Sequence, residues 1–124
     1  MKAVVVRRHG GLESLLLEER PVPEPAPGEV RVRVRAVALN HLDVWVRRGV
    51  PGHPYPLPLV PGCDISGVVD AFGPGGHPSF KAGDPVLVAP GVSCGACAEC
   101  SRGDDHLCRG YGILGEHRDG GCAG

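Results

Sequence analysis

The stretch CGACAECSRGDDHLC, residues 94–108, contains four of the six cysteines of the chain in the spacing C-x2-C-x2-C-x7-C. Thiolates two residues apart can turn toward one tetrahedral ion, and four thiolates around Zn²⁺ form a closed site without an open coordination position. Glycines beside the cysteines permit the backbone reversals that such a site requires. We therefore predict a loop-rich structural zinc lobe over residues 91–110, with the ligands Cys94, Cys97, Cys100 and Cys108.

Three other uses of these cysteines are weaker. A bacterial iron–sulfur run has three residues before a final Cys-Pro, whereas seven residues precede Cys108-Arg109 here. The apolar run after Met1 is too short for a signal peptide, so we expect a cytoplasmic protein, and disulfides are rare in that compartment. Four independent buried thiols at this density would be unusual.

The bulk composition limits the fold and the partners. The chain has 124 residues, enough for one small domain, and its net charge is −1. That balance gives no electrostatic reason to expect nucleic acid or a membrane surface as a partner, and no stretch approaches the length of a membrane span. The 20 glycines and 13 prolines gather at 49–62, 73–85 and 90–124, which indicates the turns of a loop-rich β domain.

Between these turns the pattern predicts strands and one helix. Residues 29–39 (EVRVRVRAVAL) alternate valine with arginine, which is typical of a half-buried strand with a solvated arginine face. Segments 2–8, 14–20, 63–73 and 84–90 read as further strands, with Pro85 at an edge or entry position. Residues 40–49 form the predicted helix, with Asn40 as its cap and Gly49 at its end. Beyond Pro90 we expect no regular element before Ile113.

The surrounding segments carry a family resemblance. GVSCGACAECSRGDDHLC resembles the structural-zinc lobe of the medium-chain dehydrogenase/reductase superfamily, which includes the zinc-type alcohol dehydrogenases and the quinone oxidoreductases. PGEVRVRVRAVALNHLD, PGCDISGVVDAFGPG, FKAGDPVLV and the terminal DGG follow in the order of that family. The resemblance implies a mainly β, GroES-like, partly open barrel with one or few short helices, over residues 1–124.

The same resemblance implies the catalytic domain of an NAD(P)-dependent oxidoreductase. In the family a Rossmann domain follows and binds the nucleotide, but no G-x-G-x-x-G stands between a strand and a helix here. We therefore expect an incomplete domain that is inactive in isolation. NAD(P)H would bind to the full-length enzyme, which we expect to be a homo-oligomer that acts on a small molecule.

The family's catalytic zinc ligands are replaced. Asn40 stands at the position of the first cysteine ligand, and Leu42 stands at the position of the hydroxyl residue of the proton relay. Cys63 and Asp64 follow Gly62 where the family has G-H-E. Asparagine is a poor zinc ligand and leucine cannot pass a proton, so both changes argue against metal-assisted alcohol oxidation. Thiolate and carboxylate are zinc donors, however, which leaves an atypical metal site as an alternative.

The helix segment also resembles the metal-free quinone oxidoreductase branch. Its pattern N-P-x-D-x-x-x-R-x-G is matched, except at the proline, by Asn40, Asp43, Arg47 and Gly49. By this resemblance Asn40 would lie near the nicotinamide and Trp45 on the pocket wall, while His41 matches an alcohol dehydrogenase residue that contacts the cofactor pyrophosphate. The predicted catalytic group is then Asn40, Asp43, Cys63 and Asp64, serving hydride transfer to a quinone or enone.

Each of these residues also has a structural interpretation. Asn40 and Asp43 could serve only as a cap and a helix-dipole partner, Trp45 could belong to the core, and Cys63 could be a buried small hydrophobe. We assign no role to Cys122, and the histidines at 53, 77, 106 and 117 show no spacing typical of a site. A non-catalytic, zinc-stabilised β-barrel that acts as a binding module, or a truncated remnant, is the alternative function.

Overall fold

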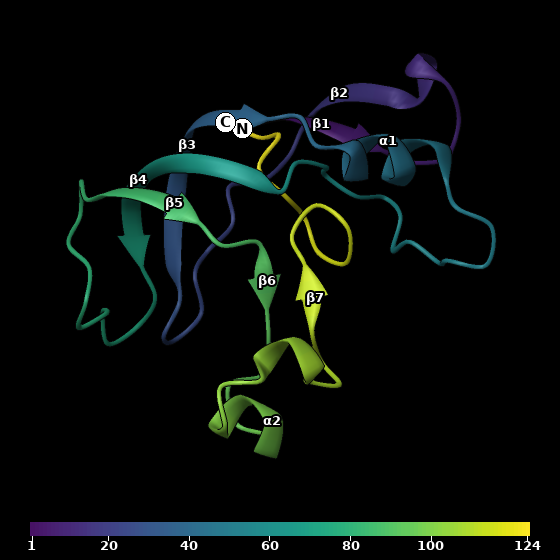
Figure 1. Ribbon diagram of the computed structural model, residues 1–124. Coiled ribbons are helices and arrows are strands. Elements are labelled where there is room, and N and C mark those ends of the chain that lie inside the picture. The colour runs from purple at the N-terminus through teal and green to yellow at the C-terminus, as the bar shows by residue number, and fades with distance from the viewer.

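The computed structural model describes residues 1–124, which fold into three small antiparallel sheets with short helices between them (Figure 1). The sheets pair β1 with β2, β3 with β4 and β5, and β6 with β7. The strands are β1 (Lys2–Val6), β2 (Leu15–Glu19), β3 (Val30–Ala38), β4 (Asp64–Phe72), β5 (Pro85–Val88), β6 (Gly91–Val92) and β7 (Gly112–Ile113). The helices are α1 (His41–Arg48) and α2 (Ala98–Ser101), with 3-10 turns at Leu12–Ser14 and Asp105–Leu107. The mainly β, open arrangement confirms the predicted fold class.

The predicted strands at 2–8 and 14–20 pair as an N-terminal hairpin, which supplies much of the core. β1 and β2 pair from Lys2↔Glu19 to Val6↔Leu15, and the side chains of Val5 and Val6 are fully buried. Ala3 and Val5 pack with Val60 in the apolar cluster of the domain. Burying such side chains contributes about 1.5–3 kcal/mol each to folding, so the hairpin is a main anchor of the fold.

The last residues of the chain lie beside this hairpin, so the two ends sit together in Figure 1. Lys2 and Gly124 exchange two backbone hydrogen bonds of 3.1 and 2.9 Å, and Val4 N–H donates to Cys122 O at 2.8 Å. The final stretch around Cys122, to which the sequence analysis assigned no role, is therefore part of the fold. Its backbone amides are satisfied by β1 and by the 61–62 segment.

β4 is the central strand of the largest sheet, between β3 and β5. Pro85 opens the edge strand β5, where a missing N–H costs no ladder hydrogen bond. Two register irregularities in β3 break the alternation that its sequence predicts. Arg33 and Arg35 are exposed as expected. Arg31, beside the irregularity between Arg31 and Val32, is instead half-buried and pairs with Asp70 at 2.9 Å.

α1 follows β3 directly and matches the predicted helix. Asn40 is its N-cap, Gly49 is its C-cap with a φ of 78°, and the Val46 side chain is fully buried. The helix lies beside the β1–β2 hairpin in Figure 1. No helix of the chain is long and apolar enough to cross a membrane.

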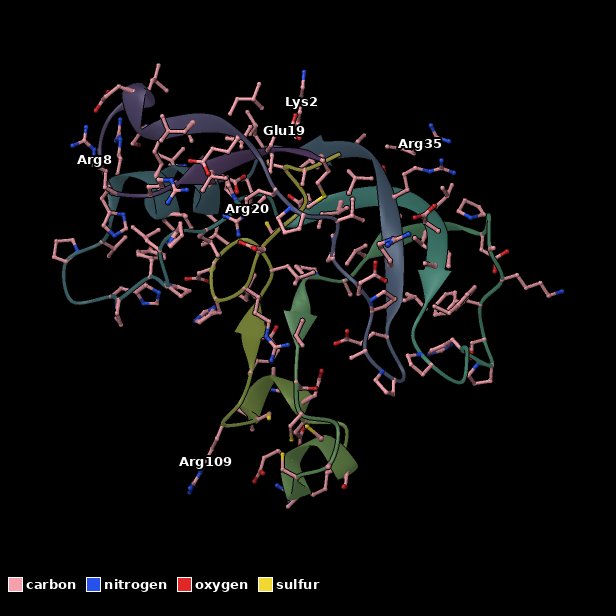
Figure 2. The ribbon with its side chains drawn as sticks, turned by 180° about the vertical axis from the view of Figure 1, so that it is seen from behind. Lys2, Arg8, Glu19, Arg20, Arg35 and Arg109 are labelled. Atoms are coloured by element: carbon pink, nitrogen blue, oxygen red, sulfur yellow. The ribbon has the colours of Figure 1, made fainter.

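Residues 91–113 form a lobe that projects from the barrel (Figure 1). The expectation of no regular element before Ile113 is wrong, because β6 and β7 pair as a two-stranded ribbon and α2 follows Cys97. These elements are too short to leave a periodic pattern in the sequence. Leu114 N–H donates to Pro90 O at 2.9 Å and closes the base of the lobe. Figure 2 shows Arg109 at the far end of this lobe, pointing away from the barrel.

We expect Val46→Ala to destabilise the protein by about 1–3 kcal/mol, because it leaves a cavity between α1 and the core. The free energy of unfolding from urea titration checks this. Val22→Ala is the matched control, since Val22 is 49% exposed and its truncation should cost less than about 0.5 kcal/mol. Equal losses in the two variants would contradict the assignment of Val46 to the core.

Candidate functional site

The lobe brings its four cysteines together. The sulfurs of Cys94, Cys97, Cys100 and Cys108 all lie within 4.8 Å of one another, close enough to hold one metal ion. Cys97 is the N-cap of α2, Cys100 lies within that helix, and Cys108 is buried directly after the second 3-10 turn. The sulfur atoms gather within the lobe in Figure 2. The predicted ligand set therefore converges, and its chemistry fits Zn²⁺.

Hydrogen bonds favour the thiolate form of two of these cysteines, Cys94 and Cys100, whose pKa values are lowered, whereas hydrogen bonding to the Cys100 thiol raises the pKa of Cys97 to about 12. Backbone amides of Ala96 and Cys97, followed by the neighbouring thiols, lower the pKa of Cys94 from 9.0 to about 6. Gly110 N–H also donates to Cys108 Sγ at 3.3 Å. A thiolate is the form that binds metal, so the backbone around Cys94 favours the form of this residue that can hold an ion.

Asp43 joins the start of α1 to the loop before β4. Its Oδ2 accepts the Asn40 N–H at 2.8 Å, which completes a capping box, and its Oδ1 accepts the Gly62 N–H at 2.8 Å. One carboxylate thus satisfies two backbone donors from segments far apart in the chain. Asp43 therefore does more than interact favourably with the helix dipole, which is the structural role predicted from the sequence, because it also links α1 to the loop before β4.

Asn40 and Asp64 meet across this junction. Leu42 N–H donates to Asn40 Oδ1 at 3.1 Å, and Asn40 Nδ2 donates to Asp64 Oδ2 at 3.1 Å. Because Leu42 N–H can only donate, the amide oxygen of Asn40 must face the helix and its nitrogen must face Asp64. Asn40 is therefore a cap, as one interpretation predicted, and it also keeps one exposed N–H free.

Cys63 lies between these polar residues but is buried, with 4% of its surface exposed. Burial raises the pKa of its thiol above 9.0, and the negative charges of Asp64 and Asp43 raise that pKa further. The thiol is therefore protonated at neutral pH. Cys122 shares this environment, since its sulfur would lie 2.8 Å from a Cβ placed on Gly62, and burial raises its pKa as well.

Two other predicted residues lie on the exposed side of α1. Trp45 is 49% exposed, so its interpretation as a core residue is wrong. Its ring packs edge-on against His41, with 4.9 Å between the ring centroids. His41 and Trp45 thus form a small exposed aromatic pair beside Asn40.

One group of residues was missed by the sequence analysis. The side chains of His53, Glu116 and His117 meet, and their ligand atoms lie within 4.8 Å of one another. The expectation that these histidines belong to no site rested on spacing alone. The pair Glu116-His117 could have drawn attention, but only the fold shows that it meets His53.

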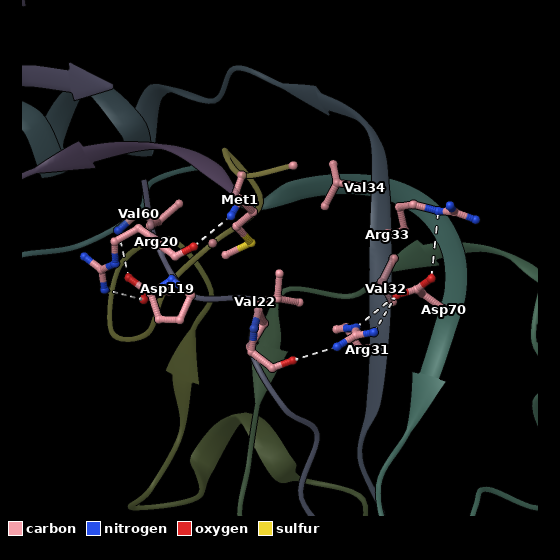
Figure 3. A pocket seen from close by; sticks show the side chains of 15 residues that line it. Met1, Arg20, Val22, Arg31, Val32, Arg33, Val34, Val60, Asp70 and Asp119 are labelled. Atoms are coloured by element: carbon pink, nitrogen blue, oxygen red, sulfur yellow. Dashed lines mark hydrogen bonds and ion pairs between the residues drawn. The ribbon is translucent and has the colours of Figure 1, made fainter. Parts of the chain in front are cut away.

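A cavity of about 550 Å³ lies elsewhere, between β3 and the two ends of the chain (Figure 3). Arg20 and Asp119 approach within 3.7 Å on one side of it, and the Arg31–Asp70 pair lies on the other. None of the predicted catalytic residues lines this cavity. Its walls also include Met1, Val60 and Gly124.

Comparison with known proteins agrees with this architecture. Residues 26–124 match the family model "Alcohol dehydrogenase GroES-like domain". The chain belongs to this family. The match confirms the resemblance to the medium-chain dehydrogenase/reductase superfamily and places the barrel and the lobe in its N-terminal domain.

The GroES-like domain has relatives of known sequence and structure. It is 38% identical to the starvation-sensing protein RspB of Escherichia coli over 122 residues, covering 98% of this chain and 34% of that protein. A crystal structure of an NAD-dependent alcohol dehydrogenase is 59% identical, with a TM-score of 0.89, over 97% of this chain and 35% of the other. A cobalt- and zinc-bound thermostable alcohol dehydrogenase from Pyrobaculum aerophilum is 39% identical, with a TM-score of 0.84, over 98% and 36%. The chain thus spans about a third of the length of these relatives.

We expect Cys97→Ser to abolish tight metal binding by the lobe and to lower the melting temperature, because an incomplete thiolate set loses much of the folding energy that the metal contributes. Metal content by plasma mass spectrometry and thermal unfolding check this. Cys122→Ser is the control, since Cys122 lies outside the cluster. Unchanged metal content in Cys97→Ser would rule out the cluster as a metal site.

We expect Asp43→Asn to destabilise the protein by about 1–3 kcal/mol, because the amide presents an N–H to one of the two backbone donors that the carboxylate accepts. Urea unfolding measures the change, and amide hydrogen exchange at Gly62 should become faster. The control is Asp105→Asn at an exposed position. If both variants matched the wild type, Asp43 would not be the link described above.

Proposed function

We propose that the chain supplies the N-terminal catalytic domain of an NAD(P)-dependent oxidoreductase that transfers hydride to a quinone- or enone-type substrate without a catalytic metal. The observation that carries this proposal is the orientation of the Asn40 amide, whose nitrogen faces Asp64. The four clustered cysteines would hold a structural Zn²⁺, and their convergence supports that role. A nucleotide-binding domain elsewhere in the protein would complete the enzyme, and residues 1–124 alone would not turn over.

The residues around Asn40 do not fit a catalytic metal ion. The amide oxygen of Asn40 is engaged by Leu42 N–H, and the amide nitrogen has no free lone pair to offer a metal. Cys63, beside it, is a protonated thiol whose two acidic neighbours disfavour the thiolate. We therefore derive no step through a metal at this position.

Asn40 itself can polarise a substrate. One Nδ2 hydrogen donates to Asp64, which leaves the other free to donate to the carbonyl oxygen of a quinone or enone. Asp64 and Leu42 hold the amide at both ends, so the donor is oriented before the substrate arrives. When bound, NAD(P)H supplies the hydride that the polarised acceptor receives.

The other predicted residues would position this donor and the ligands. Asp43 fixes the start of α1 and the Gly62 backbone, and so sets the distance between Asn40 and Asp64. The exposed ring of Trp45 offers an apolar surface beside Asn40 for a flat substrate. His41, at the first turn of α1, would face the cofactor phosphates.

A second candidate function is favoured by the comparisons. The chain is similar to an NAD-dependent alcohol dehydrogenase and to a thermostable alcohol dehydrogenase whose crystal structure holds cobalt and zinc. Oxidation of an alcohol would require a metal held by Cys63 and Asp64, with a further ligand from outside residues 1–124. In that case the pKa of Cys63 would have to fall when the metal binds.

The test uses the protein encoded by the complete reading frame, assayed with NADPH and NADH against quinones and enones, and with NAD(P)⁺ against alcohols. Asn40→Asp keeps the helix cap and removes the N–H donor, so we expect kcat with quinones to fall roughly 10²-fold with unchanged zinc content. Asp105→Asn should leave the rate unchanged. Activity confined to alcohols, and lost in Cys63→Ser, would favour the second candidate and exclude the first.

A further inference from the structure

We propose that His53, Glu116 and His117 form a binding site for a divalent transition-metal ion such as Zn²⁺, separate from the four cysteines and from the Asn40–Asp64 pair. His53 Nε2 lies 3.1 Å from Glu116 Oε1, and His117 Nδ1 lies 3.5 Å from Glu116 Oε2. A tetrahedral ion with ligand bonds of about 2.0–2.1 Å holds its ligand atoms about 3.3 Å apart. The two separations fall on either side of that value. This site is independent of the proposed oxidoreductase function.

His53 Nε2 and the Glu116 carboxylate lie close together without forming a hydrogen bond, which favours a bound ion between them. His53 Nε2 is shielded from solvent and has no partner with acceptable hydrogen-bond geometry, although a carboxylate oxygen lies nearby. Ligand atoms of one metal ion lie close together without pointing at one another, because each points at the ion. A shielded nitrogen without a partner is unfavourable, and a coordinate bond to an ion would satisfy it.

The charge of the cluster also calls for a cation. Glu116 is 9% exposed, and no lysine or arginine lies within ion-pair distance of its carboxylate. The only ionisable groups within ion-pair distance of this carboxylate are the imidazoles of His53 and His117. Two imidazoles and one carboxylate are a donor set that suits Zn²⁺ and its first-row neighbours.

The backbone places the three side chains firmly. Gly115 N–H donates to Arg118 O at 2.7 Å, and Glu116 N–H donates to Ile113 O at 3.2 Å, which closes the tight turn that carries Glu116 and His117. The His53 ring packs edge-on against Tyr55, with 4.6 Å between centroids. The site therefore requires no backbone rearrangement to gather its ligands.

One existing hydrogen bond would be exchanged. Ile113 N–H donates to His117 Nδ1 at 3.2 Å, and a metal at this nitrogen replaces that bond with a coordinate bond. The side chains of His53 and His117 are 39% and 42% exposed, so the ion would be reached from solvent. Three protein ligands leave a fourth position open, for water or for a small anionic or carbonyl ligand.

The test is a titration with Co²⁺ alone, after the cysteine cluster has been filled with Zn²⁺. We expect one further equivalent of Co²⁺ to bind, with visible d–d absorption and without the sulfur-to-cobalt charge-transfer band that a thiolate ligand produces. In the wild-type protein, the imidazole proton resonances of His53 and His117 should shift and broaden, while those of His77 should not.

The variants identify the ligands. Glu116→Gln and His53→Ala should weaken Co²⁺ binding at least tenfold, and His77→Ala, which changes an exposed loop histidine, should not. A charge-transfer band that is lost in Cys63→Ser would place the ion at Cys63–Asp64 and overturn the proposal. In the wild-type protein, the absence of saturable Co²⁺ binding would also overturn the proposal, as would unchanged His53 and His117 resonances. These two measurements need no variant, so they remain decisive if a variant does not fold.

Discussion

Three stretches of backbone cross at Gly62, and the rest of the structure depends on this close approach. A Cβ on Gly115 would lie 2.9 Å from the Gly62 backbone, and one on Gly120 would lie 2.2 Å from Gly62 O. Gly62 itself has a φ of 99°, a conformation that favours glycine. Asp43 reaches the same residue from α1. The crossing therefore joins α1, the entry to β4, the segment that returns from the lobe and the final segment. The Asn40–Asp64 pair and the His53–Glu116–His117 group are both formed by residues close to it in the chain.

The parts of the fold that the sequence predicted well are those with local causes. Asn40, Asp43 and Gly49 fix the ends of α1 through capping interactions within the same ten residues, and the structure contains each of these features. The cysteine spacing carries similar local information, because a knuckle of a few residues brings the sulfurs together. The strands were predicted from alternation, which holds wherever a single face is buried.

Predictions failed where the cause is a contact between distant segments. His53 and the Glu116–His117 turn meet because the chain folds back past Gly62. The residue spacing within either segment does not predict this contact. The alternation of β3 is broken by irregularities opposite β4, and this places Arg31 half inside the sheet edge. Asn40 shows the same limit in another form. Its cap was predictable, but its bond to Asp64 depends on β4.

The base of the lobe has a consequence for how such domains can change over evolutionary time. Pro90 O and Leu114 N–H are already hydrogen-bonded at 2.9 Å, so the chain enters and leaves residues 91–113 at nearly the same place. The β6–β7 ribbon adds only two paired positions to this contact. A deletion of the whole segment could thus be sealed by a short turn without rerouting any strand of the barrel. The cysteine-bearing lobe is, in that sense, a detachable module, whose removal would leave the strands of the barrel in place.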